Sequence, residues 1–200
     1  MRRSSHAIAL VAIALWGGRG ETASAQASRQ PESSLPPGLA APERVGRYVR
    51  GAVRDYGTAT MGVAYQYAPN QGADSSYATL YLYQREPEQR SWPADSVLAA
   101  QAAAFKEGLK VLQARGDYDN YELAFEGPDT ATVRTGEVLP GYHVAYVYQH
   151  GAARALSFMY VYVAGAALVK VRGTVPLTFW ERTDLPTFAH DVAAQVVRQP

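Results

Sequence analysis

Alternation along the chain is the feature that most constrains its fold. In residues 60–68, Met61, Val63, Tyr65 and Tyr67 alternate with small or polar residues. Successive side chains of a β-strand point to opposite faces, so this period of two predicts a strand. The same period recurs in 77–84, 142–149 and 155–163, and shorter stretches of it occupy 46–54, 120–126 and 130–138. A hairpin through Ala164, Gly165 and Ala166 predicts one further strand at 167–175.

Two segments follow the period of a helix instead. In 95–115 an apolar residue recurs every three or four positions, which predicts one buried stripe: Leu98, Ala102, Phe105, Leu109 and Leu112. Asp95 and Gly116 are suitable residues to begin and end this helix. A second helix is predicted at 185–197, after Asp184. Strands mostly follow strands, so we expect an α+β fold, a mainly antiparallel sheet of seven or eight tyrosine-rich strands with two helices packed on it.

The N-terminus predicts export. Arg2 and Arg3 precede an apolar run at 7–16, and small residues then offer cleavage after Ala25 or Ala27. An uncleaved membrane anchor is the alternative, but ten apolar residues cover only about half of a ~30 Å hydrocarbon core. We therefore expect residues 1–25 to be a secretory signal peptide of the general route and the product to be secreted or periplasmic.

The remaining chain divides in two by composition. Residues 26–42 are rich in Ser, Pro, Gln and Ala without periodicity, so they are expected to form a disordered tether. Residues 43–200 are expected to form a single domain, because this length suits one core better than two.

Charge and cysteine content narrow the classes of function. Residues 1–25 contain Arg2, Arg3, Arg19 and Glu21, so without them the 19 basic and 18 acidic residues become 16 and 17. No basic face and no basic amphipathic helix are visible, so we expect no nucleic-acid partner and no peripheral membrane binding. We also expect no membrane span after cleavage. The absence of cysteine excludes disulfides, thiol catalysis and thiolate metal sites. The oligomeric state is left open.

Tyrosine is the unusual component, with 14 residues against 5 phenylalanines. A buried phenol needs a hydrogen-bond partner, so the excess indicates half-exposed positions. One interpretation is that two helices leave part of the sheet uncovered as an aromatic surface for a small ligand or a protein partner. Its members would be the tyrosines of four strands: Tyr81, Tyr83, Tyr146, Tyr148, Tyr160 and Tyr162. The alternative is that tyrosines simply suit pleated strands.

Lys170 and Arg172 share one face of the last strand. A two-residue turn would place them with Met159 and Val161, away from Tyr160 and Tyr162, and a three-residue turn would reverse this. We expect both charges on an exposed rim of the sheet.

Catalytic patterns are weak. Outside the N-terminal segment the histidines are His143, His150 and His190. The first two would point to opposite faces of one strand, so they cannot bind a metal together. His190 is followed directly by Asp191, and neighbouring side chains of a helix point in different directions, which argues against a paired His–Asp site. No GxSxG, HExxH, P-loop or GxGxxG pattern occurs. We therefore expect no catalytic residue, no metal and no cofactor, although a hydrolase site assembled from distant residues stays open.

The element order also resembles that of a known family. Together with the phrases DYGTATMGVAYQYA, SYATLYLYQ and YVYVAGAALVKVRGTVP, it resembles the layered fold of the PsbP-like proteins of photosynthetic membranes and of small exported bacterial envelope proteins. The resemblance implies an accessory or binding domain of the cell envelope and assigns no catalytic residue. We expect a non-enzymatic binding domain, with a hydrolase or a purely structural envelope protein as the alternatives.

Overall fold

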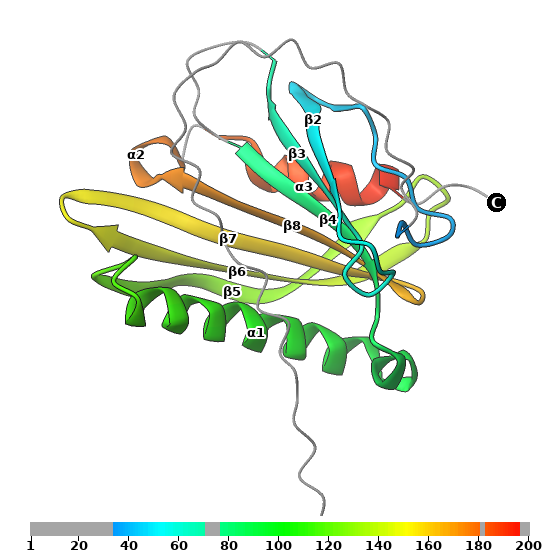
Figure 1. Ribbon diagram of the computed structural model, residues 1–200. Helices are drawn as coiled ribbons and strands as arrows, with labels where there is room; N and C mark the ends of the chain where they lie inside the picture. Colours follow the sequence, from blue (N-terminus) through cyan, green and yellow to red (C-terminus); the bar gives the residue numbers. More distant parts are fainter. Residues whose placement is uncertain (1–33, 71–76, 181–182, 197–200) are drawn as a thin grey trace, which may run out of the picture.

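One antiparallel sheet organises the protein (Figure 1). The computed structural model describes residues 34–70, 77–180 and 183–196. Eight strands form the sheet in the order β1-β2-β3-β4-β8-β7-β6-β5. Their bounds are β1 Arg44–Val45, β2 Tyr48–Asp55, β3 Val63–Pro69, β4 Tyr77–Gln84, β5 Asn120–Thr132, β6 Val138–His150, β7 Ala153–Ala164 and β8 Ala167–Pro176. Every neighbouring pair is antiparallel, as the succession of strands predicted.

The two long helices pack on opposite faces of this sheet (Figure 1). α1 (Ala94–Ala114) contacts β6 and β7 through the predicted stripe, and α3 (Leu185–Val196) contacts β1, β5 and β8 on the other side. We call these the α1 face and the α3 face. A short 3-10 helix, η1 (Pro87–Ser91), and a four-residue helix, α2 (Leu177–Trp180), were not predicted. The α+β class with two helices packed on the sheet is confirmed.

Turn geometry corrects two predicted strands. The stretch 130–138 is not one strand, because the chain turns at Gly136 (φ 87°) and so divides it between β5 and β6. The stretch 60–68 begins as a strand only at Val63, because Gly62 adopts a φ of 68°. A side chain on Gly62 would meet the carbonyl oxygen of Leu82 at 1.9 Å, so this position requires glycine.

The β7–β8 turn sets the orientation of every side chain on β8. Ala164 pairs with Ala167, which leaves a two-residue turn of Gly165 and Ala166. Met159 therefore lies opposite Arg172, and Val161 opposite Lys170. Both cations point to the α1 face, while Tyr160 and Tyr162 point to the α3 face, as expected for a turn of this length.

The N-terminal part of the described chain packs against the core. Leu39 and Ala41 are buried on the α3 face, and the Ala40 amide donates to the Val196 carbonyl at 3.0 Å. The described end of the stretch 26–42 is therefore not a tether, because its apolar residues cover core side chains. The predicted signal peptide at 1–25 and residues 26–33 lie outside the described residues. In the described part of the chain, no helix is long and apolar enough to cross a membrane.

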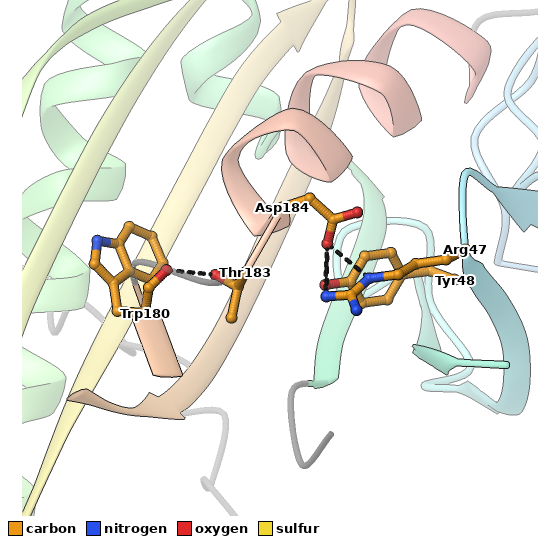
Figure 2. Close-up of polar contacts among 5 residues, drawn as sticks. All are labelled: Arg47, Tyr48, Trp180, Thr183 and Asp184. Carbon is orange, nitrogen blue, oxygen red and sulfur yellow. Dashed lines mark hydrogen bonds and ion pairs between the residues drawn. The ribbon is translucent and has the colours of Figure 1, made fainter. Parts of the chain in front are cut away.

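A carboxylate at the start of α3 joins that helix to the edge of the sheet (Figure 2). The Tyr48 hydroxyl donates to Oδ1 of Asp184 at 2.9 Å, and the Arg47 guanidinium reaches the same oxygen at 2.9 Å. Just before α3, the Thr183 hydroxyl donates to the Trp180 carbonyl at 2.9 Å. Asp184 is therefore part of the packing of the fold, which leaves other polar clusters as candidates for function.

Candidate ligand-binding face

The sheet separates the six tyrosines predicted to form one surface. Tyr81, Tyr83, Tyr146 and Tyr148 lie on the α1 face, whereas Tyr160 and Tyr162 lie on the α3 face. The reason is register: β4 and β6 present these tyrosines to the side on which β7 presents Met159 and Val161. A single surface containing all six does not form, so each group must be judged by itself.

Two of the α1-face tyrosines serve packing. Tyr146 is buried beneath α1, with its ring centroid 6.2 Å from that of Phe105. The Tyr148 ring packs on the ring of Tyr118, which follows the end of α1, with 4.1 Å between the ring centroids. Burial raises the pKa of both Tyr146 and Tyr148, so their phenols stay neutral at physiological pH.

The two α3-face tyrosines surround a histidine and a carboxylate. The Tyr162 hydroxyl donates to Oδ2 of Asp129 at 2.9 Å, and Nε2 of His190 lies 3.0 Å from the same oxygen. The Tyr160 ring packs edge-on against His190 with 5.8 Å between centroids. Burial, followed by the charge of Asp129, raises the pKa of Tyr162. The sequence did not indicate this cluster, because Asp129 and His190 are 61 positions apart.

The other two α1-face tyrosines accompany two cations. Tyr81 pairs with Lys170 across β4 and β8, and the Lys170 ammonium lies 5.0 Å from the centroid of the Tyr83 ring. The Tyr83 hydroxyl donates to Oε1 of Gln101 on α1 at 2.8 Å. The Arg172 guanidinium lies 4.8 Å from the ring of Phe105, also on α1. We call this group the cationic face: Tyr81, Tyr83, Gln101, Phe105, Lys170 and Arg172.

The prediction that Lys170 and Arg172 lie on an exposed rim is wrong. β8 is a central strand between β4 and β7, and both side chains are half-buried between α1 and β4. Burial and, to a lesser extent, the nearby positive charge of Arg172 together lower the pKa of Lys170 to about 7. Burial also lowers the pKa of Arg172, while the phenols of Tyr81, Tyr118 and Tyr83 raise it.

Neither cation has a carboxylate partner within the part of the chain that the structure describes. The other two lysines do, since Lys106 pairs with Glu126 and Lys110 pairs with Glu107. Two neighbouring half-buried positive charges without a counter-ion repel each other and lose hydration. An anion placed between them would relieve both costs.

The cationic face continues from β4 toward β2. The Arg54 guanidinium lies 5.0 Å from the Tyr56 ring, and both groups act electrostatically on Tyr81. Burial raises the pKa of Tyr81 and Tyr83, so both phenols stay neutral, and the Tyr83 hydroxyl is held by Gln101. The surface thus presents positive charge and phenols over several strands.

Two hollows lie elsewhere on the described surface. A groove of about 420 Å³ follows the opposite side of α1, where Ala99, Ala103, Lys106, Pro128 and Tyr142 line it. Its lysine is already paired with Glu126, so the groove offers no cation without a carboxylate partner. A smaller hollow of about 240 Å³ lies along β5 and β6, beside Arg154 and Glu122, which pair with each other. Among the described residues, no three His, Asp or Glu side chains are grouped to hold a metal ion.

Comparison with known proteins yields only distant likenesses. No protein-family model matches the chain, and no curated protein sequence matches it significantly. Among solved structures, cyanobacterial PsbP from Synechocystis sp. PCC 6803 is 10% identical, with a TM-score of 0.47 over 74% of this chain and 79% of that one. PA94, a Pseudomonas aeruginosa protein of unknown function, is 11% identical, with a TM-score of 0.41 over 74% and 84%. The neighbours thus include a PsbP protein, as expected from the element order. The resemblance is weak and concerns the fold only.

Proposed function

We propose that this chain is an exported, non-enzymatic binding domain of the cell envelope that binds a small anionic ligand on its cationic face. One observation carries the proposal: Lys170 and Arg172 lie half-buried on a central strand without a carboxylate partner among the described residues. The export half rests on the N-terminal pattern of residues 1–25. The anionic class rests on charge complementarity.

The chemistry of the cationic face suits an oxyanion. A guanidinium presents paired N–H donors that match two oxygens of a carboxylate, sulfate or phosphate, while an ammonium adds a compact positive charge. The neutral hydroxyl of Tyr81 is a further donor beside them, while the Tyr83 hydroxyl donates to Gln101. Two aromatic rings, Tyr83 and Phe105, flank the cations and limit access of water to the charges. An anion here would make charge-assisted hydrogen bonds in a partly dry environment, where they are strongest.

Sulfate binding tests the proposal, because sulfate remains a dianion across the relevant pH range, so a pH dependence of its affinity reports on the protein. Titration of the purified protein at constant ionic strength, followed by calorimetry or NMR shifts, should show saturable binding below neutral pH. Affinity should fall as pH rises through about 7, because Lys170 then loses its proton. Lys170→Met and Arg172→Met should each weaken binding about tenfold or more, the value of one charged hydrogen bond.

Lys106→Met is the matched control, since Lys106 also lies beside α1 but is paired with Glu126. Sulfate affinity should not change in this variant. Absence of saturable binding, or equal losses in Lys106→Met and Lys170→Met, would refute the anion site. A purely structural envelope protein would give that flat result.

A second candidate, a hydrolase assembled from distant residues, is favoured by the cluster on the α3 face. His190 and Asp129 lie within hydrogen-bond distance, an arrangement that orients an imidazole for proton transfer. A nucleophile must complete such a site, and in the described part of the chain no serine or threonine hydroxyl bonds to His190. The cluster also holds Tyr162 in the core, which gives it a structural role without catalysis.

A further inference from the structure

Lys170 differs from the other two lysines of the chain in its surroundings. Lys106 and Lys110 pair with Glu126 and Glu107, which raises the pKa of each. Lys170 instead lies against the face of Tyr83, with Arg172 as the nearest charge. Proteins activate a lysine amine as a nucleophile by removing it from water and placing it beside a second cation, and these are the surroundings of Lys170.

We propose that Lys170 forms a reversible imine with a small oxo acid, whose carboxylate is held by Arg172. The proposal deepens the proposed function, because it rests on Arg172 as an anion-binding group. Lys170 and Arg172 are two residues apart on one strand face, which separates their Cα atoms by about 7 Å. A ligand with adjacent carbonyl and carboxylate groups can bridge these two flexible side chains.

The chemistry balances without a further reagent. The neutral amine of Lys170 adds to the carbonyl carbon, and the resulting carbinolamine loses its oxygen as water. A carbon–nitrogen double bond forms, and water added back across that bond releases the oxo acid. No oxidant or reductant takes part, so the protein would capture and release the ligand unchanged.

The groups around Lys170 favour the neutral amine at physiological pH. On β8 the charged neighbour is Arg172, on β4 the titratable neighbours are Tyr81 and Tyr83, and on α1 the neighbours are the uncharged Gln101 and Phe105. No described carboxylate on these elements stabilises the ammonium. With its pKa lowered to about 7, a substantial fraction of Lys170 is free amine near neutral pH.

Reductive trapping tests the proposal on the purified chain. Glyoxylate and sodium cyanoborohydride are added at neutral pH, and peptide mapping by mass spectrometry measures the carboxymethyl adduct at each lysine. We expect Lys170 to be labelled at least about tenfold faster than Lys106 and Lys110, because their ammonium forms predominate. Labelling at Lys170 should level off above about pH 8, whereas the other two should keep rising. The amino terminus gives a separate peptide and does not enter the comparison.

Glycolaldehyde is the matched probe, because a hydroxymethyl group replaces the carboxylate of glyoxylate. Wild-type Lys170 should prefer glyoxylate, and Arg172→Gln should lose that preference while still reacting with glycolaldehyde. Equal labelling of all three lysines, or no preference for glyoxylate, overturns the inference. Saturable sulfate binding without adduct at Lys170 would overturn the imine while leaving the anion site intact, so the two proposals fail separately.

Discussion

Replacing Lys170 with methionine should remove a pH dependence of stability that the wild-type protein shows above neutral pH. In the folded state, burial and Arg172 lower the Lys170 pKa to about 7, whereas a lysine in the unfolded chain titrates near 10.5. Between these values the unfolded chain binds one proton more than the folded protein. Stability therefore rises with pH across this window and is lost as pH falls toward 7.

The size of the effect follows from proton linkage. One proton of difference changes the free energy of unfolding by at most about 1.4 kcal/mol per pH unit. Between about pH 7.5 and 9.5 the wild-type protein should gain about 2 kcal/mol from Lys170. Above about pH 9.5 the tyrosines complicate the measurement. Burial raises the pKa of Tyr83 and Tyr162, so the free energy of unfolding falls with pH once phenols in the unfolded chain ionise near pH 10.

Urea denaturation at several pH values measures this slope directly. Lys170→Met should flatten the pH dependence, and Lys106→Met should retain the wild-type slope, because the Lys106 pKa is raised and lies outside the window. The methionine side chain keeps the apolar stem, so packing against Tyr83 is largely conserved. If the free energy of unfolding depends on pH in the same way in wild type and Lys170→Met, Lys170 titrates normally. That result would also refute the activated amine.

Two further predictions concern the α3 face. Gly141→Ala would place a Cβ 2.5 Å from the buried Tyr162 ring, so it should lower the free energy of unfolding by about 1–3 kcal/mol, measured by urea denaturation. Gly127→Ala, whose Cβ would meet nothing closer than 3.6 Å, is the control and should cost much less; equal losses would contradict the packing argument. For the hydrolase alternative, p-nitrophenyl acetate turnover should be no faster in wild type than in His190→Ala. A rate that depends on His190 would favour the enzyme and count against a non-enzymatic domain.

Local periodicity predicted the helices well because each depends on its own apolar stripe. The prediction of 95–115 differs from α1 by one residue at each end, and that of 185–197 differs from α3 by one residue. Strands were harder to delimit, because alternation continues through a hairpin whose turn is encoded by one glycine. Gly136 shows this: it interrupts the alternating stretch 130–138, and β5 and β6 meet there.

The candidate site was only partly accessible from the sequence. The sequence left the orientation of Lys170 open between two turn lengths, and the observed two-residue turn makes it face away from Tyr160 and Tyr162. Burial of Lys170 was not predictable, because it depends on β4 pairing with β8 across the intervening strands and α1. Strand order in a sheet is a long-range property that no local pattern encodes.

Hydrogen bonding explains why the two faces use tyrosine differently. On the α3 face three buried rings end at polar partners within the fold: Tyr48 donates to Asp184, Tyr67 to the Pro42 carbonyl and Tyr162 to Asp129. These phenols donate their hydrogen bonds to the protein itself, so replacement by phenylalanine would remove a hydrogen bond from the fold in each case. On the cationic face, the phenols lie beside positive charges that lack a described counter-ion. The three α3-face tyrosines thus have a structural role, as do Tyr146 and Tyr148 on the α1 face, and the proposed ligand site rests instead on the two cations, Lys170 and Arg172, that have no carboxylate partner among the described residues.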